Sequence, residues 1–387
     1  MPEVLNGFPE SEFEDRTNRA QSLMKKNNID ALLLTTEPEV RYFSGFHTLF
    51  WQSPTRPWFI YVPREGKPIA VIPEIGAELM RSTWIDDIRT WSAPNPSDDG
   101  ITQLKELIES DLGVGGSVGI PMGHETHVRM PLSDFQSLRE ALSSYNFIDA
   151  TDIIRSLRMI KSELEIEKIS HICQITSKTF SQADSLFYGG QTLQDSFREF
   201  KRANLANGAD DVPYLVGGAG PGGYRDVISP PTNRRLEQGD LFMLDTGSVF
   251  DGYYCDFDRN FAMGIADDLS KYAYDILWRA TEAGRVAMVP GATCKSVFVA
   301  MREVIEELDK SSNDVGRLGH GLGMQLTEWP SLAEFDETIL QNNMVMTLEP
   351  SISYGDGKLM VHEENLVIRD GQAHYLTQRA ARDLPVI

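Results

Sequence analysis

The stretch "LDTGSVFDGYYCDFDR" places acidic residues inside a sequence that otherwise reads as β-strand. Asp245 follows three apolar residues, and Asp256 comes after a turn marked by Asp251-Gly252. If the segments on either side of the turn pair, both carboxylates can project from one face of a sheet. Two buried carboxylates repel each other and resist desolvation, so the pair needs a cation or a shared proton. Asp258 points to the same face by strand alternation.

Two further acids and one histidine occur in comparable settings. Glu349 in "TLEP" and Glu363 in "VHEENLVI" interrupt apolar strand-like runs, and His320 lies among glycines in "GRLGHGLGMQLTEWP". The bare backbone around His320 leaves room for the imidazole to approach a partner closely. A helix cap or an ion pair with arginine explains any one such acid. Four acids and one imidazole together suit divalent Mn, Co, Zn or Fe, with carboxylates bridging two ions.

The chain length and the order of expected elements predict two domains, 1–155 and 156–387. The first part alternates helices and strands, as in an α/β domain; they are expected at 13–28, 30–36, 58–74, 100–111, 115–122 and 131–143. The second part has long helices before and between paired strands, and its helices are expected at 162–187, 194–207, 268–288 and 293–308. Helices that cover one antiparallel sheet indicate an α+β domain.

Composition excludes some classes of partner. The formal charge of −21 repels phosphate backbones and anionic lipids, so we expect neither nucleic acid nor membrane as a partner. The opening "MPEVLNGFPESEFEDR" lacks the basic start and apolar run of a secretory signal, which predicts a cytoplasmic protein. The three cysteines, Cys173, Cys255 and Cys294, are far apart and show no CxxC spacing. We expect them to be reduced and buried.

Two segments imitate known motifs. The glycines from Gly218 to Gly223 fit GxGxxG, but a dinucleotide fingerprint requires a helix to begin inside it, and "PGGYRDVISPP" cannot begin one. We expect a loop there that lets backbone approach something closely. The "HETH" run, residues 124–127, lacks the i,i+4 histidine spacing of a helical zinc site and predicts a surface loop.

The order and context of the five candidate residues resemble the pita-bread metallohydrolase family, which includes methionine aminopeptidase, Xaa-Pro aminopeptidase, prolidase and the metal-free creatinase. "DTG…GYYCDFDR", "GHGLG", "TLEP" and "HEENLVI" resemble its motifs in order, and "RMIKSELEIEKI" is similar to its domain-joining helix. The resemblance implies a pita-bread catalytic domain, with helices covering a curved antiparallel sheet, after a creatinase-type N-terminal domain suggested by "EPEVRYFSGF". It also implies a homodimer. The implied ligands of a dinuclear centre are Asp245, Asp256, His320, Glu349 and Glu363.

We take Glu363 rather than Glu364 as the last ligand, because the family's ligand precedes an acidic or polar residue and then the apolar strand. The implied reaction is cleavage of an amide C–N bond by a hydroxide that bridges two divalent ions. Glu349 takes the proton of the nucleophile and relays it to the leaving nitrogen. An Xaa-Pro aminopeptidase or dipeptidase acting on a dipeptide or another small molecule is the first expectation.

Two departures from the family's pattern keep other functions open. Thr327 stands where the peptidases usually carry a second histidine, and the upstream histidine expected near Ile228-Ser229 is missing. An alternative is therefore an enzyme of a small metabolite, such as a cyclic amide hydrolase like ectoine hydrolase or a lyase like that of dimethylsulfoniopropionate. A non-catalytic binding protein is a second alternative, against which the intact ligand set argues.

Substrate contacts are also implied. "FHTLFWQSPTRPWF" gathers aromatics around Arg56, so Trp51, Arg56 and Trp58 are candidates to reach a neighbouring subunit's active site, and the simpler interpretation is a core-packing loop. Candidates beside the ligands are Tyr254, Asp258 and Thr327. Arg379 could hold a substrate carboxylate or form a salt bridge, and His362 should face the other side of the strand from Glu363.

Overall fold

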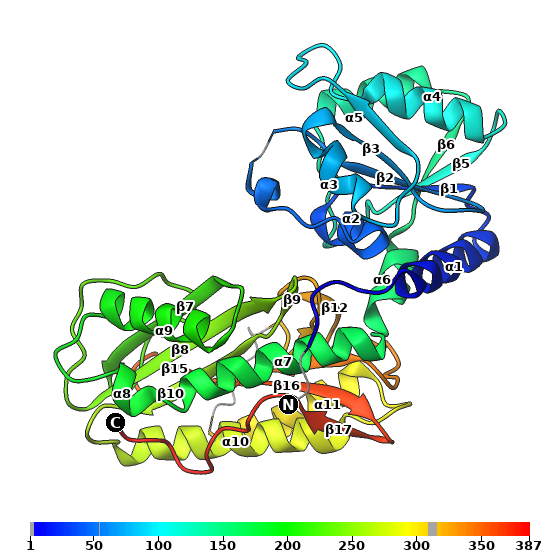
Figure 1. Cartoon of the computed structure of the whole chain (residues 1–387). Helices are drawn as coiled ribbons and strands as arrows, with labels where there is room; N and C mark the ends of the chain where they lie inside the picture. The colour runs from blue at the N-terminus through cyan, green and yellow to red at the C-terminus, as the bar shows by residue number, and fades with distance from the viewer. Residues whose placement is uncertain (1–3, 54, 309–315) are drawn as a thin grey trace. The chain divides into compact units, whose positions relative to one another are not determined.

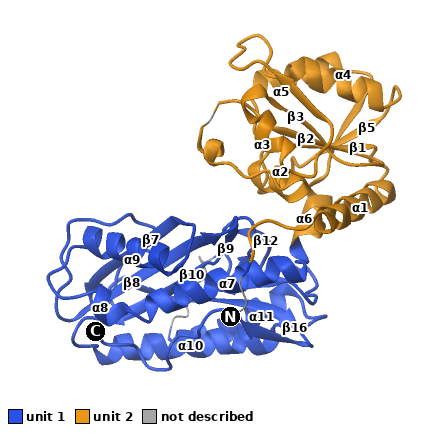
Figure 2. Ribbon diagram, viewed as in Figure 1, with its two compact units in different colours: residues 1–4, 159–387 blue, residues 5–158 orange. Residues whose placement is uncertain are grey.

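The chain folds into two compact units, Leu5–Arg158 and Met159–Ile387, with Val4 belonging to the second (Figure 1 and Figure 2). The computed structural model describes all residues except 1–3, 54 and 309–315. The predicted boundary near residue 155 falls inside α6 (Thr151–Met159), the helix in which the two units separate. We call Leu5–Arg158 the N-terminal unit and Met159–Ile387 the catalytic unit.

The N-terminal unit is built on one mixed sheet with the strand order β4-β3-β2-β1-β5-β6. The strands are β1 (Ala31–Leu34), β2 (Phe59–Pro63), β3 (Ile69–Pro73), β4 (Ile88–Trp91), β5 (Ser117–Ile120) and β6 (Asn146–Asp149). β2 runs antiparallel to both β1 and β3, while the outer pairs are parallel. The segment expected as regular structure over 58–74 forms the antiparallel β2–β3 hairpin.

Helices accompany this sheet as an α/β domain requires. They are α1 (Glu10–Lys26), α2 (Glu37–Ser44), α3 (Ala77–Arg81), α4 (Ile101–Asp111) and α5 (Leu132–Ala141), with short 3₁₀ turns at Leu49–Gln52 and Glu74–Gly76. All four residues of β1 are buried. Such a continuous apolar strand belongs in a sheet that is covered on both faces.

The catalytic unit contains helices on both sides of its strands. They are α7 (Glu163–Phe180), α8 (Ala183–Leu186), α9 (Leu193–Asn207), α10 (Asp268–Ala287) and α11 (Cys294–Ile305). α7 begins with a capping box. The Ser162 hydroxyl accepts a hydrogen bond from the Glu165 amide, and the Glu165 carboxylate accepts one from the Ser162 amide. The helix predicted over 162–187 is too long, because α7 ends at Phe180 and a separate turn, α8, follows.

The strands of the catalytic unit form two main antiparallel sheets. One has the order β10-β8-β7 with β9 beside β8, and the other has the order β12-β11-β13-β16-β17. The strands, together with the β14–β15 hairpin, are β7 (Asp211–Pro221), β8 (Asp240–Phe250), β9 (Tyr253–Tyr254), β10 (Phe257–Ala262), β11 (His320–Gly321), β12 (Glu328–Ser331), β13 (Val345–Leu348), β14 (Ser351–Tyr354), β15 (Lys358–Val361), β16 (Glu364–Arg369) and β17 (Gln372–Tyr375).

Helices cover these sheets from outside. α7 and α9 pack on β7 and β8, and α10 packs on β13 and β17. A large apolar core of buried side chains from α10 and α11, among them Leu277 and Met301, lies against strand residues such as Met346 and Leu366. The pita-bread α+β architecture predicted for this half is confirmed, and its strands bring distant parts of the sequence to one face.

The turn between the acidic strands is a tight one. Asp251 and Gly252 both have positive φ, 44° and 73°, as the first and second positions of a type I′ hairpin turn require. β8 continues into pairs with β9 and β10, and Asp245 lies directly opposite Asp258. The pairing predicted for this segment is therefore confirmed.

Three other predictions from the sequence concern the glycines from Gly218 to Gly223, the "HETH" run and the cysteines. Gly218 and Gly220 lie in β7, where they pair with β8, so the prediction of a loop was wrong for them. Gly222 and Gly223 lie in the turn that follows β7, as predicted. A side chain at Gly217 would lie 2.2 Å from the Met243 carbonyl oxygen, so the close approach is to the neighbouring strand. The "HETH" run is a loop with both histidines exposed, and the three cysteines are buried and unbridged, as predicted.

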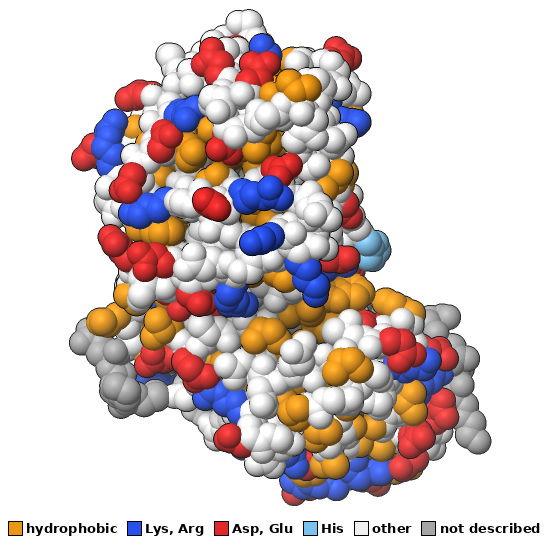
Figure 3. Space-filling model, turned by 90° about the vertical axis from the view of Figure 1, so that its right-hand side faces the viewer, with side chains coloured by type: hydrophobic (Ala, Val, Ile, Leu, Met, Phe, Trp, Pro, Cys, Tyr) orange, Lys and Arg blue, Asp and Glu red, His pale blue; other side chains and the backbone are white. Residues whose placement is uncertain are grey.

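The surface agrees with a chain that is acidic but mixed in charge. On the face drawn in Figure 3, acidic and basic side chains are interspersed among apolar ones. Among the described residues, every helix falls short of the length or the apolar character needed to cross a membrane.

Candidate metal centre

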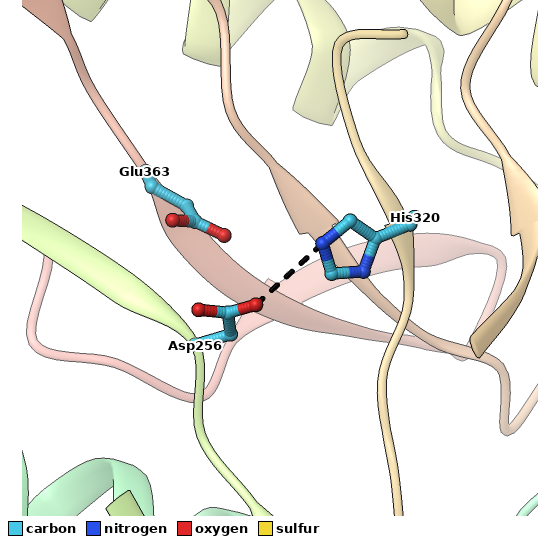
Figure 4. Close-up of side chains that lie close together, drawn as sticks. All are labelled: Asp256, His320 and Glu363. Atoms are coloured by element: carbon cyan, nitrogen blue, oxygen red, sulfur yellow. Dashed lines mark ion pairs between the residues drawn. The ribbon is translucent and has the colours of Figure 1, made fainter. Parts of the chain in front are cut away.

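Three potential ligands converge in the catalytic unit (Figure 4). One ligand atom each of Asp256, His320 and Glu363 lies within 4.8 Å of the other two, and all three residues are buried. Asp256 sits between β9 and β10, His320 begins β11, and Glu363 immediately precedes β16. His320 Nε2 is 3.5 Å from Asp256 Oδ2. Three segments that are remote in sequence thus supply donors to one point.

The other two predicted ligands border the same cluster. Glu349 follows β13, and its Oε1 is 3.7 Å from His320 Nε2. Asp245 lies on β8, where the Tyr214 hydroxyl donates a hydrogen bond to its carboxylate. Of these side chains, Glu349 keeps 23% of its surface exposed while His320 keeps 3%. Solvent therefore reaches the cluster at Glu349, and Asp245 is likewise only half-buried.

The backbone around His320 fixes the orientation of its ring. Nδ1 lies 2.9 Å from the Gly321 carbonyl oxygen, to which it donates when protonated, and this tautomer leaves the Nε2 lone pair facing the carboxylates. The His320 amide donates to Thr347 Oγ1 on β13. A side chain at Gly319, with φ of 153°, would lie 2.4 Å from the Thr347 carbonyl oxygen. Glycine is required there because the strand passes too close for a Cβ.

Side chains behind the cluster hold the backbone of the ligands. Asn365 on β16 accepts from the Asp256 amide at 2.9 Å and donates to the Asp256 carbonyl, which joins the acidic hairpin to the second sheet. Asp258 accepts from the Glu363 amide and from Asn260. Such supporting bonds orient ligands more rigidly than packing alone.

The choice between the two neighbouring glutamates is clear in the structure. Glu364 is fully buried and accepts from the Ala380 amide, Thr377 and Arg259. Glu363 instead points to Asp256 and His320. Successive side chains along a strand point to opposite faces, so Glu363 and Glu364 are separated and Glu363 is the one that lies in the cluster.

Burial and mutual repulsion make the carboxylates reluctant to ionise. Burial, followed by repulsion from Glu349, raises the pKa of Asp245 to about 7. Burial also raises the pKa of Glu349 to about 7, against the opposing charge of Arg317. For Asp256 and Glu363, burial and then the neighbouring carboxylates raise the pKa well above its usual range. The cluster needs cations to stay ionised at neutral pH.

The unpaired oxygens fit such cations. Asp245 Oδ1 and Glu363 Oε1 are buried and accept no hydrogen bond from any described residue. Buried acceptors are normally satisfied, so these two are suited to metal coordination. The donor set of carboxylates with one imidazole suits divalent transition ions.

The opposite face of the strand behaves differently. His362 Nδ1 lies 3.0 Å from Thr281 Oγ1 on α10, away from Glu363. Burial, aided by Arg259 and Arg379, lowers the pKa of His362 to about 3, so the ring stays neutral. This placement agrees with the expectation from strand alternation.

The substrate contacts predicted in the catalytic unit lie at different depths. Tyr254 and Thr327 are half-buried, and the Tyr254 amide donates to the Gly323 carbonyl next to the histidine loop. Asp258 is 1% exposed, so the predicted substrate contact is replaced by support of Glu363. Arg379 pairs with Glu282 and lies 3.4 Å above the Trp278 ring, which favours the salt-bridge alternative.

The aromatic candidates Trp51, Arg56 and Trp58 belong to the N-terminal unit. The rings of Trp51 and Trp58 are 6.0 Å apart, and Trp58 is 2% exposed. Arg56 covers the Phe50 ring. This packing supports the core-packing interpretation for Trp58 and for Trp51, which is also buried, whereas Arg56 is half-buried.

Reasoning from the sequence missed three residues around the cluster. Tyr214 contacts Asp245, Arg317 contacts Glu349, and Asn365 clamps Asp256. Asn365 could have been found because it lies two residues after Glu363 on a strand. Tyr214 and Arg317 carry no comparable signal, since their contacts depend on the register between strands.

Comparison with known proteins agrees with this geometry. Residues 167–370 match the model of metallopeptidase family M24, and residues 16–160 match that of the creatinase/prolidase N-terminal domain. The chain belongs to metallopeptidase family M24. Its M24 region contains all five candidate ligands, and the preceding match identifies the creatinase-type, two-domain form of the family.

M24 relatives cover nearly the whole chain. A Xaa-Pro dipeptidase of Pyrococcus horikoshii is 27% identical over 364 residues, which is 93% of this chain and 96% of the relative. The structure of a prolidase from Thermococcus sibiricus superposes with a TM-score of 0.86 at 23% identity, covering 97% of this chain and 99% of that one.

The same fold also occurs under a different name. The N-terminal domain of the FACT complex subunit SPT16 from chickpea superposes with a TM-score of 0.77 at 14% identity, covering 97% of this chain and 98% of that domain. Likeness at such identities shows the fold alone, so the chemistry must be argued from the site.

Proposed function

We propose that this M24 enzyme is a metal-dependent Xaa-Pro dipeptidase. The observation that carries the proposal is the cluster of Asp256, His320 and Glu363, with Glu349 beside His320 and Asp245 close enough to be repelled by Glu349. Two buried oxygens of this group lack a donor among the described residues. The relatives named Xaa-Pro dipeptidase, matched over more than nine tenths of both chains, support the substrate class.

The proposed cofactor is a pair of divalent ions, manganese, cobalt, iron or zinc. Asp245, Asp256, His320, Glu349 and Glu363 would hold them. When bound, such ions acidify a water molecule and polarise the scissile carbonyl.

The residues of the chain then have distinct tasks. Glu349 faces the opening of the cluster and accepts the proton of the attacking water, then delivers it to the leaving nitrogen of the proline. His320 presents Nε2 in a fixed direction because Gly321 and Thr347 hold its ring and backbone. Tyr214 keeps one oxygen of Asp245 occupied, which leaves Oδ1 for coordination.

A second candidate rests on the missing histidines. Thr327 and the Ile228-Ser229 segment stand where peptidases of this kind carry imidazoles, and Ile228 is 73% exposed. Without these imidazoles a peptide amide lacks the groups that orient it in the peptidases, which favours a small metabolite such as a cyclic amide. We keep this function as the alternative.

The proposed assembly is a homodimer, as the resemblance to the family implies, and the proposed location is the cytoplasm. Light scattering of the purified protein and fractionation of the source cells test these two points.

Metal analysis and a substrate panel test the function. We expect close to two divalent ions per chain after loading, and hydrolysis of Xaa-Pro dipeptides that chelator abolishes. Less than one ion per chain, with activity indifferent to chelator, contradicts the dinuclear mechanism. Turnover of a cyclic or zwitterionic metabolite without turnover of any dipeptide would replace the first function by the alternative.

A further inference from the structure

A short loop, residues 322–327, connects β11 to β12 and borders the metal cluster. It begins two residues after His320, the imidazole drawn in Figure 4. A side chain at Gly247 would lie 2.2 Å from Leu326 Cδ1. Leu326 therefore packs over β8, on the strand face that carries Asp245. The loop is thus in a position to contact a substrate at the cluster.

The carboxylate of Glu328, the first residue of β12, lies against this loop. The Gln325 amide donates a hydrogen bond to Glu328 Oε1 at 3.1 Å. A Cβ at Gly323 would lie 2.8 Å from both carboxylate oxygens of Glu328, so the backbone of the loop passes directly over them. The loop is folded around the Glu328 carboxylate.

A lysine binds the same carboxylate. Lys161 Nζ is 3.1 Å from Glu328 Oε2, and the two side chains keep 2% and 5% of their surface exposed. The Lys161 amide donates to the Asn343 carbonyl, two residues before β13, which fixes the lysine backbone. Because the ammonium binds Oε2, the carboxylate is oriented with Oε1 toward the Gln325 amide.

The burial of this ion pair favours a role in conformation. Desolvation of two buried charges offsets much of their attraction, so such a pair is a poor means of stabilising a fold. A buried pair can instead select one conformation over its alternatives. An apolar pair of the same size would offer no acceptor to the Gln325 amide. The Lys161–Glu328 pair therefore suits the task of specifying the shape of the loop.

The loop is also joined to the acidic hairpin. The Gly323 carbonyl accepts a hydrogen bond of 2.8 Å from the amide of Tyr254, which lies two residues before Asp256. Tyr254 and Thr327 are both half-buried candidates for substrate contact. A displacement of the loop would therefore shift side chains on two sides of the cluster.

We infer that Lys161 and Glu328 are positioning residues, whose buried ion pair fixes the loop 322–327 in the shape that aligns a substrate with the metal cluster. For its kinetic consequence, this inference rests on the proposed function. Neither residue is a candidate metal ligand, and both act through the backbone of the loop.

The test compares variants of the two residues in protein loaded with manganese. Lys161→Met removes the cation, and Glu328→Gln keeps the shape of the side chain but replaces a charge-assisted hydrogen bond by a weaker neutral one. The double variant completes a cycle. The matched control is Lys168→Met, because Lys168 on α7 forms a similarly buried pair, 2.7 Å from Asp251, with 3% and 8% of the side chains exposed. That pair contacts the hairpin turn instead of the loop.

Thermal unfolding verifies that each variant is folded, and kcat and KM are measured on one Xaa-Pro dipeptide. We expect Lys161→Met and Glu328→Gln each to lower kcat about 10- to 100-fold, as loss of a supporting contact or a small misplacement of substrate does. KM should change much less. The double variant should lose no more than Glu328→Gln alone, because Lys161 acts through Glu328. Lys168→Met should lower the Tm but keep kcat close to wild type.

Metal content should stay at the wild-type level in all variants, since His320 is held separately by Thr347 and Gly321. Additive losses in the double variant, an unchanged kcat in both single variants, or an equal loss in Lys168→Met overturn the inference. Loss of metal from Lys161→Met or Glu328→Gln also overturns it, because the pair would then act on the ligand and not on the loop.

Hydrogen exchange separates this inference from the proposed function. The exchange of amides in peptides that span residues 321–328 is followed by mass spectrometry, without any substrate. Faster exchange there in Lys161→Met and Glu328→Gln, but not in Lys168→Met, supports the role of the pair even if no dipeptide is hydrolysed. Unchanged exchange in both variants overturns it. Absence of dipeptide hydrolysis by the wild type contradicts only the proposed function.

Discussion

The sheets of the two units use their buried surfaces in opposite ways. In the N-terminal unit, apolar side chains such as Leu33, Phe59 and Val71 fill the core. In the catalytic unit, one strand face carries carboxylates whose pKa values are raised by burial. The first arrangement stabilises the fold directly. The second costs stability in the absence of a cation, which is typical of a functional site.

The largest expected effect is the loss of activity and metal binding in a variant that still folds. His320→Asn removes the imidazole ligand and should lower activity at least 1,000-fold, since it also disturbs the ions that polarise the carbonyl. Metal content measured by mass spectrometry should fall with it. The matched control is His374→Asn on the exposed side of β17, which should keep both. Full metal content in His320→Asn would contradict its assignment as a ligand.

A substitution in the core of the N-terminal unit should have the opposite effect: it should destabilise the fold and leave the metal site intact. Leu33→Ala leaves a cavity in the fully buried β1 and should cost about 2–5 kcal/mol of unfolding free energy in the N-terminal unit. Denaturant unfolding measures that loss, and metal titration of the folded variant should give the wild-type stoichiometry. A changed metal affinity would show that the contrast between the units is too simple.

Removal of metal should reveal how much the buried carboxylates of the site lower the stability of the folded protein. In the metal-free protein, the raised pKa of Asp245 and Glu349, about 7 for each, means that the folded state binds more protons than the unfolded state between about pH 4 and 7. Stability should therefore fall as the pH rises through this range. Scanning calorimetry of chelated protein should show a lower Tm at pH 7 than at pH 5, and metal loading should remove the difference. A Tm of chelated protein that rises with pH would refute this account.

A smaller effect on kcat is expected from a substitution next to the candidate ligand Asp245. Tyr214→Phe removes the hydrogen bond to Asp245 and should lower kcat about 10-fold, in line with the loss of one supporting bond to a ligand. Tyr188→Phe, at a position 62% exposed, is the control. Unchanged kcat and metal affinity in Tyr214→Phe would reduce this tyrosine to a packing role.

The smallest expected effect concerns the N-terminal unit. If Trp51 contributes to a pocket, Trp51→Ala should lower kcat/KM several-fold. It should also cost about 3–5 kcal/mol of unfolding free energy in its unit, because Trp51 is 9% exposed. Activity identical to wild type would remove Trp51 from the list of substrate contacts and leave the core of the N-terminal unit with a purely structural role.

The sequence allowed much of this site to be predicted, for identifiable reasons. Asp245, Asp256, Glu349 and Glu363 stand out because an acid in an apolar strand has to be compensated. Local alternation also separated Glu363 from His362. The role of Asp258 was misjudged because alternation gives a face but not a depth, and Asp258 lies behind the ligands.

Other features depended on contacts between distant strands. The Tyr214–Asp245 bond follows from the β7–β8 register, and the Asn365–Asp256 clamp joins two different sheets. The glycines of β7 resembled a loop because glycine-rich sequence is typical of turns. In the structure, backbone carbonyl oxygens lie too close for a side chain, that of Met243 on β8 at Gly217 and that of Gly223 at Gly220. Such distances are not encoded in any local pattern.

The Asn365 clamp has a consequence for the order of folding. It links Asp256 in the acidic hairpin to Asn365 on β16, which lies 109 residues later in the chain. Until β16 pairs with β13, Glu363 is not in place and Asp256 lacks its clamp. Closing such long loops is slow compared with forming local structure. We therefore expect the five candidate ligands to come together only after β16 has paired, later than the local hairpins form.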